Sequence, residues 1–553
     1  MKDVTDTFQK KKKKQKKGGK RVRSLYIVLA IALFVYYYVT LPAIHYAAID
    51  FWFFVLLAII GVVVIEVLAD SSNFISELKT GDVKDVKWRS IPKKYLLLIL
   101  PLPIIWLVAM IGNLIFSPFF FAEGYATMID IEQADFATEF PKTDLDQITL
   151  IDRDTATRLG NRHLGALTNL VSQFEAADDY TQINIDGYPY RVTPLEYAGF
   201  FKWLNNFGEG IPHYFKVDNV TGTVTVETPE QPIKYSYSDM FNRDVMRKLR
   251  FDNPFSLFQA PNFEVDDEGN PYYIATTYTR NFFLREPEAK GLITLNAMTG
   301  ETTNYTLDEV PTWVDRVHSS DLILHQLEMN GRYQGGYWNS LFSKQGVTEP
   351  TAGYNYLPIE DDLYLYTGIT SVVSDESNIG FVLVNMRTKE THFYPLNAAE
   401  EFSAMQSAEG SVQETGYVAT FPLLISIEGR AMYILSLKDS SGLIKEYALI
   451  DVQNYQKVYV ESSVERLMLS YAEDNPINID EIETEEELAT INGQIEDIQA
   501  VVVEGNTIYY FMVDGSVYRA NISLSEQLPF VEAGEDVQFT ATENGIVREI
   551  EFD

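Results

Sequence analysis

The chain has 553 residues, 44 Lys and Arg against 78 Asp and Glu, a formal net charge of −34, and no cysteine. This length exceeds what one hydrophobic core supports, so several domains are expected. Disulfides, thiolate metal sites and a cysteine nucleophile are excluded. The charge is segregated, because residues 1–121 sum to +9 and residues 122–553 sum to −43.

Three apolar runs lie near the N-terminus, at residues 25–44, 51–69 and 95–121. Each is close to or above the ~20 residues that a helix needs to cross about 30 Å of hydrocarbon. The only acidic residue within them is Glu66, near the end of the second run. We therefore predict three transmembrane helices within residues 24–121.

The positions of the basic residues predict how these helices are oriented. Lys and Arg are concentrated in the tail, residues 1–23, and in the loop at residues 70–94. Because such residues stay on the cytoplasmic side, residues 122–553 are expected to be extracytoplasmic. A cleavable signal peptide is the alternative for the first run, but the second run follows at once, which favours a multi-pass anchor in the cell membrane. The tail is expected to contact membrane lipid and no nucleic acid, since no aromatic residues are interleaved among its lysines.

Residues 122–210 are expected to form a mixed α+β region. Leu and Val at helical spacing predict a helix over residues 161–175, and alternation about Asp186-Gly187 predicts a hairpin over residues 180–192. Large aromatic residues at helical spacing predict a second helix over residues 195–207.

A recurring stretch organises residues 211–471. Copies at residues 291–307 and 380–396 share a Gly, an Asn, a Thr-x-Glu-Thr core, a Tyr and a Leu in register, and looser copies lie at residues 213–227 and 446–460. Each copy has two apolar or alternating runs around a turn of Asp or Asn, Thr and Gly, which is typical of a β-hairpin. One supersecondary unit is therefore expected several times. Further helices are predicted at residues 237–249, 311–327 and 398–413.

Two charged clusters in this region have competing interpretations. Arg243, Arg247, Lys248 and Arg250 are a basic group in an acidic region, which either docks an envelope carboxylate or phosphate or, as we favour, pairs with neighbouring acids. Residues 266–270 are acidic and loosely resemble a calcium loop. The closing Glu of such a loop is replaced by Thr277, so a turn is the better interpretation.

The last part of the repeated region resembles a PepSY module, in which a helix with paired alanines precedes an antiparallel sheet that ends in a Val-Asp-x-x-Thr-Gly turn. The residues that carry the resemblance are Ser403 to Glu409, Gly416-Tyr417, Glu428-Gly429, Tyr433-Ile434, Tyr447 to Asp451 and Lys457-Val458. Val217-Asp218 to Gly222 and Asn296 to Gly300 match only its final turn. The resemblance implies an envelope protein that restrains or assists a partner, with no catalytic residue of its own.

Residues 472–488 form an acidic linker, and residues 489–553 predict a small β-barrel. Five short strands with turn glycines give this segment an OB-like pattern, at residues 494–503, 507–513, 517–523, 537–540 and 546–552. Many OB barrels bind nucleic acid. Arg519 and Arg548 are the only basic residues in this segment, so a polyanion would be repelled and a structural or protein-binding barrel is favoured.

The sequence contains no recognisable reaction motif. The histidines after residue 122 are scattered without metal-ligand spacing, at His163, His213, His318, His325 and His392. His318 and His325 are two helical turns apart and would face one way on a helix, although exposed or capping roles are favoured. No nucleophile elbow or phosphate loop appears. We predict no catalytic, cofactor-binding or metal-binding residue and no cofactor.

These features together predict an α+β fold: three N-terminal transmembrane helices, repeated PepSY-like units of a helix with antiparallel hairpins, and a small C-terminal β-barrel. The expected function is that of a membrane-anchored extracytoplasmic binding or scaffold protein, not an enzyme, that modulates a cell-envelope partner through its sheet edges. One alternative is an envelope hydrolase, which buried carboxylates of raised pKa in one cleft would favour. The other is an accessory subunit of a membrane transporter.

Overall fold

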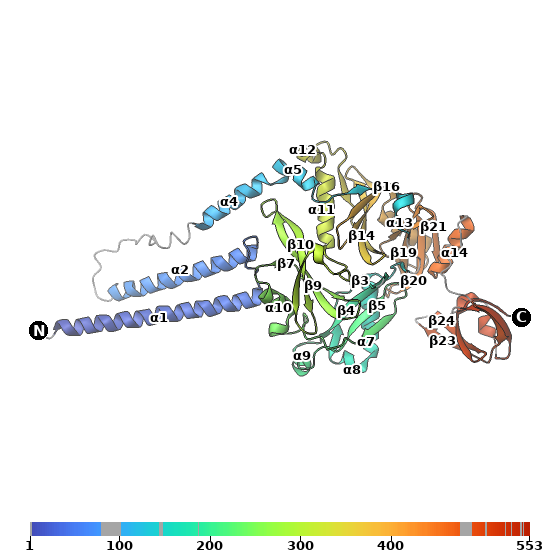
Figure 1. Ribbon diagram of the computed structural model, residues 1–553, viewed down its shortest axis with the longest axis horizontal. Helices are drawn as coiled ribbons and strands as arrows, with labels where there is room; N and C mark the ends of the chain where they lie inside the picture. Colours follow the sequence, from blue (N-terminus) through green and yellow to red (C-terminus); the bar gives the residue numbers. More distant parts are fainter. Residues whose placement is uncertain are drawn as a thin grey trace. The chain divides into compact units, whose positions relative to one another are not determined.

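The fold was analysed in a computed structural model of the chain, which describes residues 3–78, 101–142, 147–185, 187–475, 489–503, 506–525, 527–531, 533–541, 545 and 547–552. The chain is a mixed α+β protein that divides into two compact units, Met1–Leu467 and Met468–Asp553. Among the described residues, the first unit contains the N-terminal helices and four β-sheets, and the second contains two small sheets (Figure 1).

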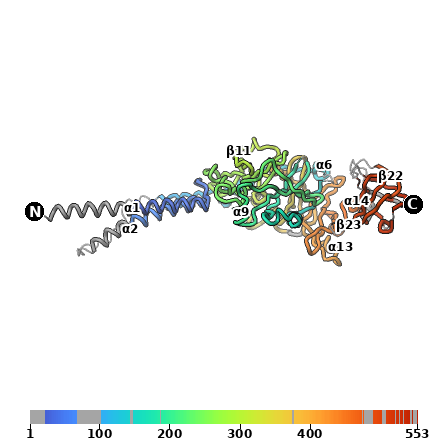
Figure 2. Tube along the Cα trace, turned by 90° about the horizontal axis from the view of Figure 1, so that it is seen from below, coloured from blue at the N-terminus to red at the C-terminus, as the bar shows by residue number. Residues whose placement is uncertain are grey.

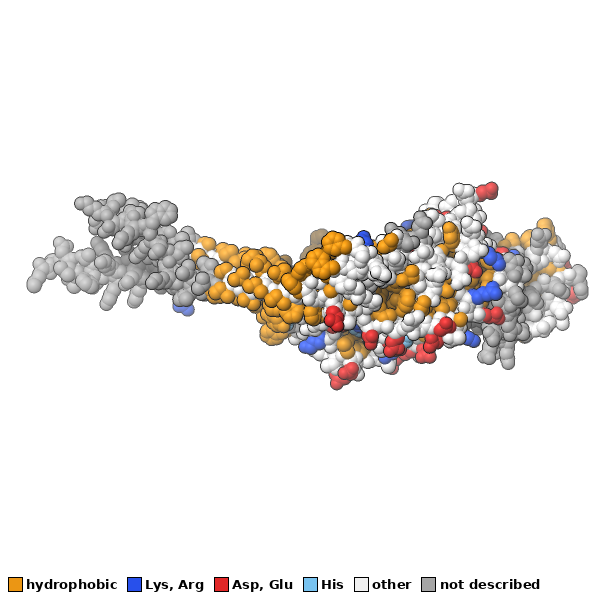
Figure 3. All heavy atoms as spheres, turned by 90° about the horizontal axis from the view of Figure 1, so that it is seen from above, with side chains coloured by type: hydrophobic (Ala, Val, Ile, Leu, Met, Phe, Trp, Pro, Cys, Tyr) orange, Lys and Arg blue, Asp and Glu red, His pale blue; other side chains and the backbone are white. Residues whose placement is uncertain are grey.

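Two N-terminal helices are long and apolar enough to cross a membrane. Helix α1 (Asp3–Thr40) contains the apolar segment Val22–Thr40, and α2 (Ile49–Leu78) contains Ile49–Glu66. Hydrophobic side chains cover the outside of both apolar segments, as Figure 3 shows on one face, which suits a lipid environment. Glu66, at the end of the second segment, is hydrogen-bonded, because the Tyr26 hydroxyl donates to its Oε1 at 2.6 Å.

The third apolar run forms two helices rather than one straight helix. Helix α4 (Pro101–Ile115) and α5 (Pro118–Ala126) are bent by 61°. The bend falls where Ser117 is extended and Pro118, which has no backbone N–H, begins the second helix. Residues 95–100 of the predicted span and residues 79–94 of the predicted loop lie outside the described residues. A third membrane span therefore stays a prediction.

The four sheets of the first unit share one strand order. In each, the long third strand pairs with the first two strands along one side and with the fourth strand along the other, and the fifth strand pairs with the fourth. All of these pairings are antiparallel.

We call these sheets, each with its preceding helices, modules 1 to 4. Module 1 comprises α7 (Arg153–Ala166), α8 (Thr168–Val171), β2 (Phe174–Ala176), β3 (Thr181–Ile185), β4 (Tyr188–Tyr197), β5 (Tyr214–Asp218) and β6 (Val224–Glu227), with α9 (Phe200–Asn206) between β4 and β5. Module 2 comprises α10 (Val245–Asp252), β7 (Leu257–Phe258), β8 (Asn262–Val265), β9 (Pro271–Asn281), β10 (Glu286–Asn296) and β11 (Thr302–Thr306).

The other two modules follow the same plan. Module 3 comprises α11 (Ser320–Tyr333), α12 (Tyr337–Leu341), β12 (Thr348–Pro350), β13 (Asn355–Ile359), β14 (Asp362–Ser371), β15 (Ser374–Asn385) and β16 (Thr391–Ala399). Module 4 comprises α13 (Glu401–Ser411), β17 (Val418–Ala419), β18 (Leu423–Ile427), β19 (Arg430–Lys438), β20 (Ile444–Asp451) and β21 (Val458–Glu461). Helix α14 (Val464–Asp474) comes next, and residues 476–488 of the predicted acidic linker lie outside the described residues.

The recurring turns make the same hydrogen bonds in all four modules. Asp218, Asn296, Asn385 and Asp451 each occupy the last position of the fourth strand, and each accepts on Oδ1 from the backbone N–H groups two and three residues later, at 2.8 to 3.0 Å. Such Asx turns explain why Asp or Asn recurs in the sequence. Positive φ follows at Gly222, Gly300 and Lys389.

Loss of this side-chain acceptor should loosen the turn. We expect Asn296→Ala to speed hydrogen exchange at the Met298 and Thr299 amides about tenfold, because two N–H groups lose their acceptor at a cost of about 1 to 2 kcal/mol. The control Asn296→Asp keeps the oxygen and should exchange as the unaltered chain does. Equal exchange in Asn296→Ala would show that the side chain does not hold the turn.

Several predicted helices begin or end elsewhere. The predicted helix at residues 161–175 is α7 and α8 followed by strand β2, and the predicted helix at residues 195–207 is strand β4 up to Tyr197 and then α9. The helix predicted to begin at residue 311 begins at Ser320, whose preceding residue Ser319 caps it by accepting from Leu322 N–H at 3.3 Å. Strands β4 and β5 pair across residue 210, so the first sheet continues through the boundary predicted there.

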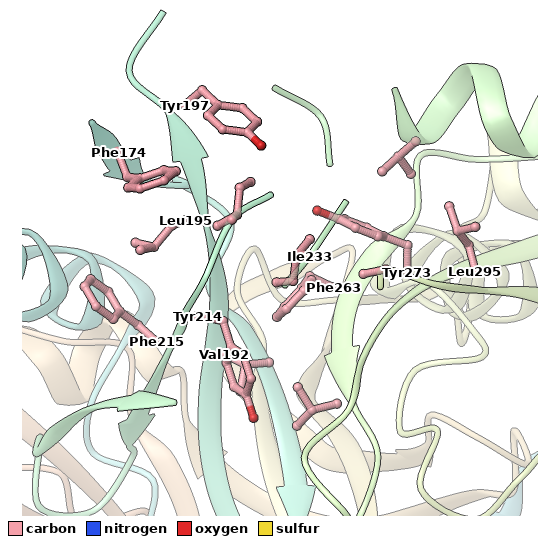
Figure 4. Close-up of a cluster of buried hydrophobic side chains, with 14 of the residues drawn as sticks. Phe174, Val192, Leu195, Tyr197, Tyr214, Phe215, Ile233, Phe263, Tyr273 and Leu295 are labelled. Carbon is pink, nitrogen blue, oxygen red and sulfur yellow. The ribbon is translucent and has the colours of Figure 1, made fainter. Parts of the chain in front are cut away.

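Modules 1 and 2 share one hydrophobic core. Buried side chains from β4 and β5, including Val192, Leu195 and Phe215, join Phe263 of β8 and Tyr273 of β9 in one cluster (Figure 4). An aromatic contact crosses between the modules, because the ring centroids of Tyr214 in β5 and Phe263 in β8 are 5.9 Å apart. The two modules are therefore fixed against each other by apolar burial.

The second unit contains two three-stranded antiparallel sheets. One has the order β22 (Ala489–Gln494), β26 (Asp536–Ala541), β27 (Val547–Phe552), and the other has β23 (Asp497–Val503), β24 (Asn506–Val513), β25 (Ser516–Asn521). The first predicted strand, residues 494–503, corresponds to β23, which begins at Asp497, and its first residue, Gln494, is the end of β22. Phe511 and Phe539 from the two sheets meet at 5.2 Å in a common core.

Candidate functional site

One sheet edge is occupied by an added strand from elsewhere in the chain. Strand β1 (Glu132–Gln133) pairs in parallel with β16, with Glu132 opposite His392 and Gln133 opposite Phe393. Ala134 N–H extends the ladder by donating to the Phe393 carbonyl at 2.9 Å. The outer edge of module 3 thus accepts an extended segment that approaches in parallel.

The corresponding edges of the other modules carry no added strand among the described residues. These edges are β6, β11 and β21. The most exposed is β11, in which Thr303, Asn304 and Thr306 are all exposed. Figure 2 shows β11 at the periphery of the modules. An unpaired strand edge presents N–H and C=O groups that another chain can use.

Strand alternation fixes which groups of β11 face outward. Asn296 N–H donates to the Glu301 carbonyl at 2.9 Å, so alternate residues of β11 from Thr303 onward bond inward to β10. Asn304, between them, presents its N–H and C=O outward. It lies eight residues after Asn296, as Phe393 lies eight residues after Asn385, and is therefore equivalent to the residue that binds Ala134.

The residues of β11 do not protect this edge. Exposed edge strands are commonly blocked by Lys, Pro, a bulge or a covering segment. Strand β11 reads Thr302-Thr-Asn-Tyr-Thr306 and pairs with β10 in continuous register. Thr and Tyr favour extended structure. The edge of β11 can therefore pair with an added strand.

A buried polar cluster lies where modules 1 and 2 meet. Asp315, between module 2 and α11, accepts on Oδ2 from Asn184 N–H of β3 at 2.6 Å, and its own N–H donates to Glu264 Oε2 of β8 at 3.3 Å. The adjacent Arg316 donates to the Tyr356 hydroxyl of module 3 at 3.0 Å. Glu264, Asp315 and Arg316, which we call the junction cluster, thus contact three modules.

Burial raises the pKa values of the two carboxyl groups of this cluster. It raises the pKa of Glu264 to about 7, against the opposing effects of Arg316 and the Asp315 N–H. Burial, followed by the charge of Glu264, raises the pKa of Asp315 well above its usual value. Glu264 Oε1 and Asp315 Oδ1 have no hydrogen-bond partner among the described protein atoms. Burial therefore favours the neutral form of both carboxyl groups.

The carboxyl groups of the junction cluster are not accessible to solvent, as the residues of an active site would be. The side chains of Glu264 and Asp315 are 0% and 1% exposed. A cleft of about 950 Å³ lies between α5 and α11 and is lined by other residues, among them Glu123, Asp130, Asn330 and Tyr333. A substrate could not reach the two carboxyls without separation of the modules, so the geometry favours a structural role.

Two arginines of the basic cluster identified in the sequence contact the end of the first apolar helix. Arg250 Nε donates to the Leu41 carbonyl at 3.0 Å, and Arg247 lies over the Tyr38 ring at 4.4 Å and donates to its carbonyl at 3.4 Å. Lys248 pairs with Asp252 at 2.8 Å, which is the pairing favoured from the sequence. The two arginines therefore bind carbonyls at the C-terminal end of α1, where the helix dipole favours cations.

The histidines do not form a pair. His318 precedes the N-cap of α11 and is buried, which lowers its pKa to about 4, whereas His325 on the helix contacts Glu286 Oε2 at 2.8 Å, and this hydrogen bond raises its pKa. Their predicted common face was wrong, because the helix begins after His318. In the described part of the chain, no group of three His, Asp or Glu side chains is placed to hold a metal ion.

The acidic stretch at residues 266–270 is a turn. Asp266 Oδ1 accepts from Asn270 N–H at 2.7 Å, and Oδ2 accepts from the Asn270 side chain at 3.1 Å. Gly269 has a φ of +81°, which glycine adopts without strain. The interpretation of this stretch as a turn is confirmed.

Comparison of the chain with protein-family models and with curated proteins gave no match.

Proposed function

We propose that this chain is a membrane-anchored extracytoplasmic binding or scaffold protein that modulates a cell-envelope partner without catalysis of its own. The observation that carries the proposal is the pairing of β1 with β16, in which a sheet edge of these modules receives an extended segment. The equivalent edge, β11, has the same turn and register as β16 and is exposed at Thr303, Asn304 and Thr306. Binding there would be β-strand addition, with main-chain hydrogen bonds supplying affinity.

The proposed topology supports an envelope location. Two apolar helices, the basic tail and the acidic remainder favour export of residues 122–553, and the bent pair α4 and α5 would be the third span. The four sheets with one strand order would be PepSY-like units, and the second unit would be an OB-like barrel. A membrane anchor raises the concentration of the modules next to an envelope partner.

The test is photo-crosslinking in cells, with a photoreactive residue at Asn304 and a matched control at Val373, which is also exposed but lies in the hairpin between β14 and β15. We expect Asn304, and not Val373, to capture one stoichiometric envelope protein. Absence of any product at Asn304 and at the equivalent residues Val226 and Val460 would contradict binding at these edges. Turnover of peptide or glycan by the purified chain would instead support the rival hydrolase.

A further inference from the structure

Two patches of exposed aromatic residues lie at the end of the modules that carries the membrane helices. Patch A surrounds Trp203 on α9 and comprises Phe200, Phe201, Leu204, Phe207 and Phe241. Patch B comprises Phe119 and Phe120 of α5 with Trp338, Leu341 and Phe342 in and after α12. Exposed apolar groups of this size mark interaction surfaces.

Patch A adjoins the outer end of α1. Arg247 donates to the Phe241 carbonyl at 2.5 Å and also to the carbonyl of Tyr38, two residues before the end of α1. The Phe241 ring lies 5.9 Å from that of Trp203. One arginine side chain therefore separates the patch from the last turn of an apolar helix.

Patch B includes the end of the third apolar run, because Phe119 and Phe120 lie within residues 95–121. Phe119 contacts Tyr337 and Trp338 of α12, with ring centroids 5.2 and 5.5 Å apart, and Trp338 stacks on Phe342 at 5.8 Å. Helix α5, which carries Phe119, directly follows the apolar α4. In Figure 1, α12 lies above α10 and beside α5, and α9 lies below α10, which is next to the end of α1.

The chemistry of both patches suits the headgroup layer of a bilayer. Trp, Tyr and Phe are enriched at that depth because their rings prefer a partly apolar environment. Arg243 is held in patch A by donation to the Phe207 carbonyl, so a cation is available to lipid phosphates. Binding to a bilayer requires both patches to lie level with the ends of the membrane helices. Binding to a protein partner would not require this arrangement.

We propose that patches A and B rest in the outer headgroup layer of the membrane that holds α1 and α2, so that lipid supports the modules on both sides of the anchor. The proposal rests on the anchoring stated under the proposed function. It adds that the first unit is held at the membrane surface by its own side chains.

The test uses the absence of cysteine in the chain, since each variant then carries one thiol. Phe201→Cys, Phe241→Cys and Phe342→Cys are spin-labelled in the full chain, reconstituted in bilayers of phosphatidylethanolamine and phosphatidylglycerol. Val373→Cys is the control, because its 71% exposure matches the 75% of Phe201. We expect the ratio of oxygen to nickel-chelate accessibility to be several-fold higher at the three patch positions than at the control.

The proposal would be overturned if the labels in the patches were as accessible to the nickel reagent as the label at Val373. It would also be overturned if they were shielded from both reagents, because that would indicate contact with protein. Failure of the chain to incorporate into bilayers would instead contradict the anchor. A second measurement without a label is quenching of tryptophan fluorescence by lipids with brominated chains. We expect Trp338→Phe to lose part of the quenching, and unchanged quenching would contradict insertion of patch B.

Discussion

Asn304→Pro is expected to reduce recovery of the envelope partner at least about tenfold, because proline removes an outward N–H and clashes with an added strand. The fold of module 2 should persist, since the Asn304 N–H is not part of the β10 ladder. Proline is tolerated on edge strands where its nitrogen faces solvent. The measurement is quantitative mass spectrometry of proteins that co-purify with the full chain from crosslinked cells.

The matched control is Asn304→Ala, which removes the same side chain and keeps the N–H. Recovery with this variant should equal that with the unaltered chain. Equal recovery with Asn304→Pro would place the binding surface away from β11. Equal loss in both variants would show that the Asn304 side chain, and not the strand edge, is recognised.

Arg316→Met is expected to lower the free energy of unfolding of the first unit by about 3 to 5 kcal/mol at pH 8, because it removes the cation whose charge favours the ionised form of the buried Glu264. The loss should be smaller at pH 5. Burial raises the pKa of Glu264 to about 7 from an ordinary 4.5, so its contribution to stability is complete below about pH 4.5 and declines as pH rises through 7. Near pH 5 Glu264 is protonated, so removal of the Arg316 charge changes the free energy of unfolding less.

Urea unfolding of the detergent-solubilised chain, followed at pH 5 and pH 8, measures this difference. Glu264→Gln supplies the control, since a neutral amide of similar shape should flatten the pH dependence without an arginine being lost. The interpretation of the junction cluster is wrong if Arg316→Met destabilises the chain equally at both pH values. It is also wrong if Glu264→Gln leaves the pH dependence unchanged.

The hairpins were predictable from sequence because their signals are local. Asp or Asn at the turn, followed by a residue with positive φ such as Gly300, specifies both the turn and its register within a few residues. The helix at residues 195–207 was misplaced because the aromatic residues there belong to two environments. Tyr197 packs in the shared core as part of β4, whereas Phe200 and Phe201 are exposed on α9.

The features that define the candidate site depend on long-range contacts. Strand β1 meets β16 about 260 residues later in the chain, and its sequence gives no sign of the partner. Glu264 and Asp315 were indistinguishable among 78 acidic residues, because their raised pKa values arise only when β3 and β8 bury them. The basic cluster was recognised, but its binding to the carbonyls of α1 depends on how helix α10 meets the membrane anchor.

Export of the modules is the claim on which the account depends, and thiol labelling in intact cells tests it most directly. Val373→Cys, in the otherwise cysteine-free chain, should react with a membrane-impermeant maleimide added outside the cells. Lys16→Cys, in the basic tail, should react only after lysis. Labelling of Lys16→Cys in intact cells, with Val373→Cys protected until lysis, would contradict the account.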